Sequence, residues 1–362
     1  MNTAKPMDLF LQPVDVWLFR DGRPFDAGSA HRAESLFPPY PTVIQGAFRT
    51  HKLVNAGINL GDRTKENKEE IEKLVGTSDT FGDIRLRGPF LARKENGKVN
   101  RYFPQPADAI VQDKTWLIPA TPIEEKPSTI KTSQSLPLLL GLNDQSGKQD
   151  EPLWLSQSAL MDYLAGKKVE GVESKKLFEI ENRTGIGVGA GRVVNEGMLY
   201  EIGFVRPMQD VGLLVEMHGY NQPEWQKPGI LHLGGEKRMA QFQIEPADPL
   251  PPNPEQTKRF KVYFTTPTFF EDGWQPKVWS KFFSGQVELV GAAINRFETM
   301  GGFNWIANPN EAIAHRSAKR FVPAGSVYYF KGNAQLKPGL LQEAITDFGA
   351  EIGFGQIIIK EW

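Results

Sequence analysis

Short runs of apolar and β-branched residues, bounded by glycine, proline or polar turns, recur along most of the chain. Such runs predict strands. The first spans residues 9–20 and ends at the turn sequence Asp21-Gly22-Arg23-Pro24. Asn96-Gly97 predicts the turn of a hairpin between residues 93 and 102. Further strands are predicted at residues 84–91, 199–205, 211–218, 260–265, 287–292 and 357–359.

Helical periodicity is confined to a few segments. After Pro41-Thr42, apolar residues recur with the helical period until Gly57, which predicts a helix. A charged run within residues 59–75 precedes a short helix, residues 155–164 predict another, and residues 121–150 read as an insertion. Two strand-rich units with few helices predict an α+β protein rather than a doubly wound parallel sheet. We expect two ferredoxin-like, RRM-like domains with insertions, at residues 1–195 and 196–362.

Composition narrows the functional classes. The 362 residues contain 42 Lys and Arg against 43 Asp and Glu, so the global basic excess of a free-standing nucleic-acid binder is absent. Any RNA contact must come from a local patch. The absence of Cys excludes disulfides, Cys-based zinc sites and thiol nucleophiles. With neither a signal peptide nor a membrane-spanning apolar run, we expect a cytoplasmic protein that does not contact a membrane.

Several distinctive segments occur along nearly the whole chain. They are PVDVWLFRDGRPF at 13–25, FPPYPTVIQGAFR at 37–49, RTGIGV at 183–188, EGMLY at 196–200, LGGEKR at 233–238, TPTFFEDGW at 266–274, VPAGSVYY at 322–329 and FGAEIGFG at 348–355. Taken in order, these segments resemble the third Cmr subunit of the repeat-associated (RAMP) superfamily. Their order and spacing make the resemblance specific.

This resemblance implies a function in antiviral defence. It implies two RAMP domains with a C-terminal glycine-rich loop, in a subunit of a type III-B CRISPR-Cas (Cmr) effector complex. Such a subunit is non-catalytic, needs no cofactor and caps the 5′ repeat-derived tag of the crRNA. Its expected partners are the crRNA, the large polymerase-like Cmr subunit and a backbone Cmr subunit.

Three groups of side chains are candidates for RNA binding. Arginine forks suit phosphates and aromatic rings suit unstacked bases. The alternative is that these are exposed cations and buried phenylalanines. The N-terminal group is Phe19, Arg20, Arg23, His31 and Arg49. Arg183 and Arg192 stand at the base of a hairpin that resembles the thumb of related subunits, and Lys237 and Arg238 follow a Gly-Gly turn.

The C-terminal glycine-rich loop is a fourth candidate. Gly349, Gly353, Phe354 and Gly355 precede the apolar strand at 357–359. Glycine permits positive φ and leaves no Cβ, so consecutive N–H groups can approach a phosphate. The alternative is a glycine turn that only packs closely. The pattern G-x-G-x-x-A at 185–190 is not a dinucleotide fingerprint, because β-branched residues follow it where a helix is required.

Catalysis is the rival function. A guide-RNA-processing endoribonuclease of the RAMP superfamily could use His31 or His51 as a general base, or Asp26 with a divalent metal. The sequence supplies no constellation that selects one of them, and the five histidines lack metal-ligand spacing. We therefore predict no catalytic residue and no metal site. A stand-alone RNA-binding module is the third possibility, and the near-neutral charge favours an assembly subunit over it.

Overall fold

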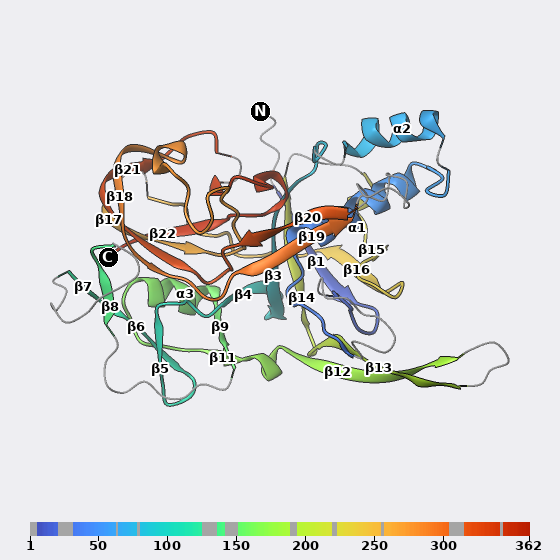
Figure 1. Ribbon diagram of the computed structural model, residues 1–362, viewed down its shortest axis with the longest axis horizontal. Coiled ribbons are helices and arrows are strands. Elements are labelled where there is room, and N and C mark those ends of the chain that lie inside the picture. Colours follow the sequence, from blue (N-terminus) through green and yellow to red (C-terminus); the bar gives the residue numbers. More distant parts are fainter. Residues whose placement is uncertain are drawn as a thin grey trace. The chain divides into compact units, whose positions relative to one another are not determined.

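A computed structural model describes residues 6–20, 32–62, 64–77, 80–124, 136–141, 151–188, 194–218, 223–254, 257–303, 315–340 and 343–362 (Figure 1). The helices are α1 Pro41–Asn55, α2 Lys65–Val75 and α3 Gln157–Leu164, with short 3-10 turns at Ser174–Lys176, Pro223–Trp225, Trp279–Lys281 and Ala350–Ile352. The strands are β1 Met7–Pro13, β2 Arg32–Ala33, β3 Arg85–Glu95, β4 Lys98–Pro104, β5 Ala109–Gln112, β6 Trp116–Pro119, β7 Thr121–Ile123, β8 Leu139–Gly141, β9 Leu153–Ser156, β10 Val169–Glu170, β11 Val172–Glu173, β12 Phe178–Val188, β13 Val194–Pro207, β14 Val211–His218, β15 Gly229–His232, β16 Met239–Ile244, β17 Thr257–Phe264, β18 Phe283–Ala293, β19 Glu298–Phe303, β20 His315–Phe321, β21 Val327–Leu336 and β22 Ile357–Glu361.

The chain forms two compact units, each discontinuous in sequence. Unit 1 comprises Met1–Val99, Lys175–Pro246 and Met300–Ala318, and unit 2 comprises Asn100–Ser174, Ala247–Thr299 and Lys319–Trp362. The expected boundary between residues 195 and 196 lies inside β13. Compact units and folding domains need not coincide, so the domain limits 1–195 and 196–362 stay a prediction.

Unit 1 is built on an antiparallel sheet in the order β3-β14-β1-β16-β15. One face of α1 covers its core, because Ile44, Ala47 and Phe48 recur at helical spacing and are buried with residues of β1 and β14. The ring of Phe48 packs 4.7 Å from that of Trp225. These contacts hold α1, and the segment that precedes it, against the sheet.

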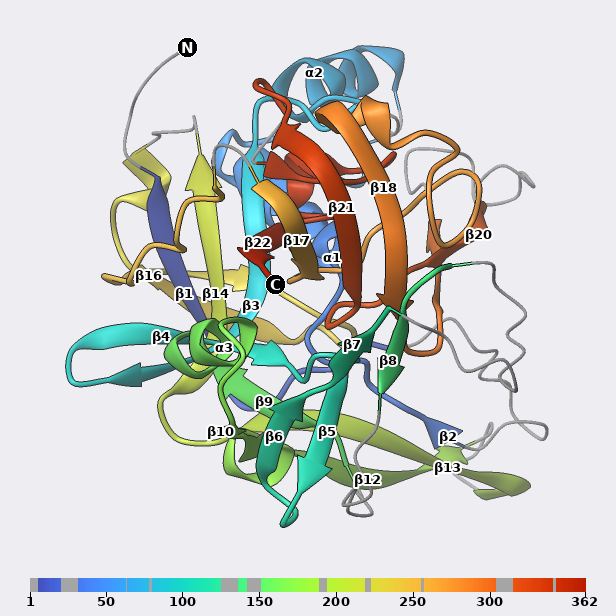
Figure 2. The ribbon, with the colours of Figure 1, turned by 90° about the vertical axis from the view of Figure 1, so that its left-hand side faces the viewer.

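Unit 2 is built on a four-stranded antiparallel sheet in the order β18-β21-β17-β22 (Figure 2). Its core is rich in aromatic side chains. Phe260 and Phe330 stack at 5.0 Å, and Trp279 meets Phe330 edge-on at 4.8 Å. Strands β11, β9 and β4 of this unit pair in that order, and both pairings are antiparallel.

The two principal sheets repeat one strand arrangement. In unit 1, β1 passes through α1 and α2 to β3, and β14 then lies between β1 and β3. In unit 2, β17 passes through a 3-10 turn to β18, and β21 lies between them. The fourth strand, β16 or β22, flanks the first in each case. The predicted α+β class is confirmed.

The smaller elements include a long two-stranded ribbon of β12 and β13 (Figure 1). Strand β2 pairs with β13 in parallel, at Glu201↔Arg32 and Ile202↔Ala33. Strands β5, β6 and β10 form a three-stranded sheet, while β7 pairs with β8 and β19 with β20.

Most predicted elements are present, with two corrections. Asn96 and Gly97 have φ of 51° and 77°, as the predicted hairpin turn requires. The first strand does not reach residue 20: β1 ends at Pro13, and the chain bends at Val14. Beyond the bend, Trp17 forms an isolated bridge to Val205 instead of continuing the sheet. Most of the charged run expected before α2 lies within that helix, which begins at Lys65.

Candidate nucleic-acid interface

The β12–β13 ribbon carries charged and aromatic residues on one face. Glu181 lies opposite Phe204 in the antiparallel register. Because alternate residues of a strand point to the same face, Arg183 and Arg206 share that face with them. The register therefore gathers two arginines, a carboxylate and an aromatic ring from strands that are about twenty residues apart in sequence.

Asp15 and Arg238 join this group from neighbouring segments. Asp15 Oδ2 lies 3.0 Å from Arg183 Nη2 and 3.3 Å from Arg238 Nη1, and Asp15 Oδ1 lies 3.1 Å from Arg206 Nη2. Glu181 Oε1 accepts from Arg183 Nε at 2.6 Å, and its other oxygen accepts from Arg206 Nε. We call Arg183, Arg206 and Arg238, with Asp15 and Glu181, the arginine cluster.

The two carboxylates orient the three guanidinium groups. The hydrogen bond from Arg183 lowers the pKa of Asp15, and the hydrogen bond from Arg206 lowers the pKa of Glu181. Both carboxylates are accessible to solvent, so the pairing contributes little to stability. Three guanidinium groups and two carboxylates leave one net positive charge.

Phe204 lies beneath the cluster. It is 4% exposed, and the guanidinium carbons of Arg183 and Arg238 lie 5.0 and 4.6 Å from its ring centroid. Cation–π contact and the carboxylates together hold the two forks in place. Guanidinium groups fixed in this way can donate their remaining N–H groups to phosphate oxygens with little loss of side-chain freedom.

The structure brings together two predicted residues and adds one that the sequence reasoning missed. Arg183 and Arg238 meet at Asp15, and Arg206 is the addition. Arg206 could have been found only by pairing position 206 with position 179 across the hairpin, and that pairing depends on the register of the two strands. Lys237 is exposed beside the cluster, with φ of 54°. Arg192 lies outside the described residues.

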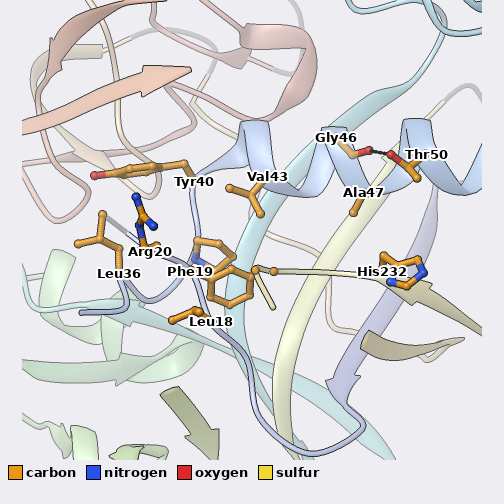
Figure 3. A pocket seen from close by; sticks show the side chains of 13 residues that line it. Leu18, Phe19, Arg20, Leu36, Tyr40, Val43, Gly46, Ala47, Thr50 and His232 are labelled. Carbon is orange, nitrogen blue, oxygen red and sulfur yellow. Dashed lines mark hydrogen bonds between the residues drawn. The ribbon is translucent and has the colours of Figure 1, made fainter. Parts of the chain in front are cut away.

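A cavity of about 330 Å³ lies next to the start of α1 (Figure 3). Its wall is mainly apolar and includes Phe19, Val43 and Gly234. Figure 3 shows Arg20 and Tyr40 near one end and His232 at the other. Apolar walls with a few polar groups at the rim are what an unstacked base requires.

Glycine shapes one wall of this cavity. Gly234 has φ of 98°, and a Cβ there would lie 2.8 Å from the carbonyl oxygen of Leu18. The next residue, Gly235, donates its N–H to that same oxygen at 2.8 Å. Two of the segments that line the cavity, around residues 18 and 234, are thus joined directly.

Two residues of the N-terminal group, Phe19 and Arg49, have structural partners. Phe19 is 5% exposed and packs 5.7 Å from Trp17, so it forms part of the cavity wall rather than an open stacking surface. Arg20 is exposed at the cavity. Arg49 donates to the carbonyl oxygen of Thr77 at 3.0 Å, which ties α1 to the segment after α2. Arg23, His31 and Asp26 lie outside the described residues.

His51 is placed as a packing residue. Its ring lies 4.8 Å from Trp225 and 5.3 Å from Phe242, and Asn55 Nδ2 is 3.0 Å from its Nε2. Burial lowers its pKa, and the charge of Glu224 opposes that shift. This arrangement favours the structural alternative for His51 over a general base.

The C-terminal glycines adopt the expected conformation. Gly349, Gly353 and Gly355 have φ of 69°, 112° and 68°. They are buried, and Phe354 is fully enclosed. A Cβ at Gly355 would lie 2.5 Å from the Cβ of Thr346, so the chain packs closely there.

The amide groups of this loop already have partners. The N–H of Phe354 donates to Gly349 at 3.1 Å, and that of Gly355 donates to Pro267 at 2.8 Å. The packing alternative therefore accounts for these glycines without a ligand. RNA binding by Gly349, Gly353, Phe354 and Gly355 stays a prediction.

No helix within the described ranges is both long and apolar enough to cross a membrane. Among the same residues, no group of three or more His, Asp or Glu side chains is arranged to hold a metal ion.

Comparison with known families decides the assignment. A family model described as CRISPR-associated protein (Cas_Cmr3) matches residues 9–362. The chain belongs to this family. The predicted resemblance to the third Cmr subunit is thus confirmed. A search of curated proteins found no match.

Two solved structures are similar to this Cas_Cmr3 family member. One chain of a cryo-EM structure of the Type III-B Cmr-beta bound to cognate target RNA matches with a TM-score of 0.51 at 13% identity, covering 98% of this chain and 99% of that chain. A chain of the Type III-B Cmr-beta bound to cognate target RNA and AMPPnP, state 1, gives a TM-score of 0.49 at 15% identity, covering 89% and 86%. The first match shows a common fold.

Proposed function

We propose that this chain is a non-catalytic, RNA-binding subunit of a cytoplasmic type III-B CRISPR-Cas (Cmr) effector complex. It caps the 5′ repeat-derived tag of the crRNA and bridges the large polymerase-like subunit to the backbone subunits. The arginine cluster carries this proposal, because it presents three oriented guanidinium groups on a chain whose overall charge is -1. Membership of the Cas_Cmr3 family supports the proposal that the chain binds RNA as part of a Cmr complex.

The cluster and the cavity form one continuous RNA-binding path in unit 1. Two segments contribute to both sites: residues 15–20 contain Asp15 and Arg20, and residues 232–238 contain His232 and Arg238. Arg20 is the fifth residue after Asp15, which limits the span between their Cα atoms to roughly 18 Å. In this arrangement the cluster binds backbone phosphates, while the cavity accepts a base that has left the stack.

The fold supports the assignment of two ferredoxin-like RAMP domains. Both principal sheets place the third strand between the first two and the fourth outside the first, with all neighbours antiparallel. This is the strand pattern of a split β-α-β unit. In unit 2, the expected first helix is replaced by the 3-10 turn Trp279–Lys281.

The surroundings of His51, whose ring packs against Trp225 and Phe242, support the proposed non-catalytic role. The rival endoribonuclease is tested by incubating the full chain with repeat RNA, with and without a divalent metal. We expect no cleavage. Cleavage that His51→Ala or His31→Ala abolishes would establish the nuclease instead.

Binding is tested with Arg183→Gln combined with Arg206→Gln, measured by fluorescence anisotropy on a tag-bearing RNA. Each lost charge-assisted hydrogen bond costs on the order of 1 kcal/mol or more, so we expect affinity to fall roughly tenfold or more. The matched control is Arg93→Gln, because Arg93 is a partly exposed arginine of the same unit that pairs with Glu95.

Equal affinity of the double variant and wild type, with both folded by circular dichroism, would remove the cluster from the RNA-binding site. The assembly role is tested separately, by recovering the tagged chain from cells. We expect Cmr subunits and short RNAs that share a common 5′ end.

A further inference from the structure

A second concave site, of about 640 Å³, lies in unit 2 where β17, β21 and β22 adjoin. Strand β17 lies between the other two, as Figure 2 shows, so its first residues meet the end of β22. The lining consists of Thr257, Lys258, Arg259, Asn333, Glu361 and Trp362. None of them belongs to the arginine cluster or to the cavity beside α1.

Arg259 and Trp362 form a stacked pair at this site. The guanidinium carbon of Arg259 lies 4.2 Å from the indole centroid of Trp362. The backbone N–H of Trp362 donates to the carbonyl oxygen of Arg259 at 3.2 Å. Tyr329 meets the indole edge-on at 5.3 Å and restrains it further. A planar guanidinium on an indole makes a platform on which a heteroaromatic ring can stack.

The charges around the platform favour an anion. Glu124 accepts from both Arg259 and Lys331, the latter at 3.1 Å, and so holds the guanidinium in place. Within the described part of the chain, Lys258 has no ion-pair partner. Lys258 and Arg259 line the site together with Glu361, and Lys331 and Glu124 lie beside Arg259.

Two polar atoms of the lining also lack a hydrogen-bond partner among the described residues. They are Thr257 Oγ1 and Trp362 Nε1, and both are shielded from solvent. Thr257 is 5% exposed. Buried polar groups are normally paired, so these two atoms are exceptions within the lining.

We infer that the concave site of unit 2 binds a nucleoside monophosphate unit, either free or within single-stranded RNA. Lys258 and Arg259 contact the phosphate, and the base stacks beside the Arg259–Trp362 pair. An aromatic platform next to an unpaired ammonium group is what a stacked base joined to a phosphate requires. A cavity of this volume is large enough for one such unit. The inference does not depend on tag binding by unit 1.

The test uses the full chain carrying Arg183→Gln and Arg206→Gln, so that the arginine cluster contributes little to RNA affinity. The probes are AMP and a single-stranded RNA octamer without the tag sequence. Binding is measured by titration, and ultraviolet crosslinks to the octamer are mapped to peptides. Lys258→Gln is the test variant. Lys167→Gln is its control, because Lys167 is an exposed lysine of unit 2 that pairs with Asp162.

We expect crosslinks in the peptides that contain residues 257–259 or 360–362, and about a fivefold or greater loss of affinity in Lys258→Gln but not in Lys167→Gln. Lys258-dependent binding of AMP identifies a free nucleotide as sufficient. Such binding of the octamer alone identifies an RNA segment as the ligand. If neither probe binds, or if Lys258→Gln binds both as the control does, the inference is wrong. A Lys258-dependent contact with a Cmr subunit, without nucleotide binding, would equally overturn it.

Discussion

At the scale of single residues, the buried carboxylate of Asp108 depends on neighbouring hydroxyl groups for its hydrogen bonds. It is 4% exposed and accepts from the hydroxyl of Tyr163 at 2.8 Å and from that of Tyr329. Burial lowers the pKa of the neighbouring Lys261, and the charge of Asp108 opposes that shift. All four groups belong to unit 2, so one carboxylate satisfies several polar groups in its interior.

Asp108→Ala should therefore destabilise the protein strongly. Removing one partner of a buried charged group costs about 3 to 5 kcal/mol, because the remaining groups stay buried without compensation. Tyr329→Phe removes a single hydroxyl and should cost about 1 kcal/mol. Chemical denaturation of the two variants measures both values. Equal and small losses would show that Asp108 does not organise this interior.

The glycine-rich loop shows what residue patterns do and do not specify. The sequence predicts backbone conformations that favour glycine, and Gly349, Gly353 and Gly355 have the positive φ values. It does not specify what approaches the backbone. In the structure the near neighbours of Gly355 are Thr346 and Ile345 of the same chain. A phosphate and a packed side chain impose the same demand on the glycine, and only the fold distinguishes them.

At the scale of elements, α1 joins the core to the cavity. Its bounds are close to those predicted from Pro41 and Gly57, because proline at the first turn and glycine beyond the last are strong signals. Phe48 and His51 lie on its inner side, next to Trp225. The helix therefore links the protonation of His51 to the packing of unit 1.

We expect His51 to make stability depend on pH. Its pKa in the folded state is below the ordinary value of 6.5, so the unfolded chain binds more protons as the pH falls below 6.5. The stabilising contribution is present above pH 6.5 and is lost as the pH falls through the folded pKa. Thermal melting at pH 7.5 and 5.5 should show a smaller pH effect in His51→Gln than in wild type. His232→Gln, at an exposed histidine, is the control. An unchanged pH effect in His51→Gln would contradict this role.

The β12–β13 ribbon marks the limit of element prediction. Its strands were expected from apolar residues and its arginines from their positions at the hairpin. Which residues share a face depends on the register, and the register shifts between Ile186 and Val188. A shift of one residue moves every later side chain to the other face. The sequence therefore could not place Arg206 beside Arg183.

At the scale of the whole molecule, distant segments pair in ways that local patterns do not encode. Leu9 lies between Val215 and Ile244, on strands more than two hundred residues away in sequence. The α+β class could be predicted because it depends on the kinds of elements. The interleaving of the two units could not, because it depends on which strands pair, and many pairings satisfy the same apolar pattern.

The charge of the whole molecule sets the final prediction, which concerns salt. With a net charge of -1, the chain has no general attraction for RNA, so binding must come from local cations. Each phosphate contact to single-stranded RNA adds about 0.7 to the slope of log affinity against log salt concentration. The Arg183→Gln and Arg206→Gln variant should therefore bind tag-bearing RNA with a slope smaller by about 1.4 than that of wild type. Arg93→Gln should leave the slope unchanged. Anisotropy titrations between roughly 50 and 300 mM salt measure it. Loss of affinity with an unchanged slope would show that these arginines support the fold of the ribbon and do not contact phosphates.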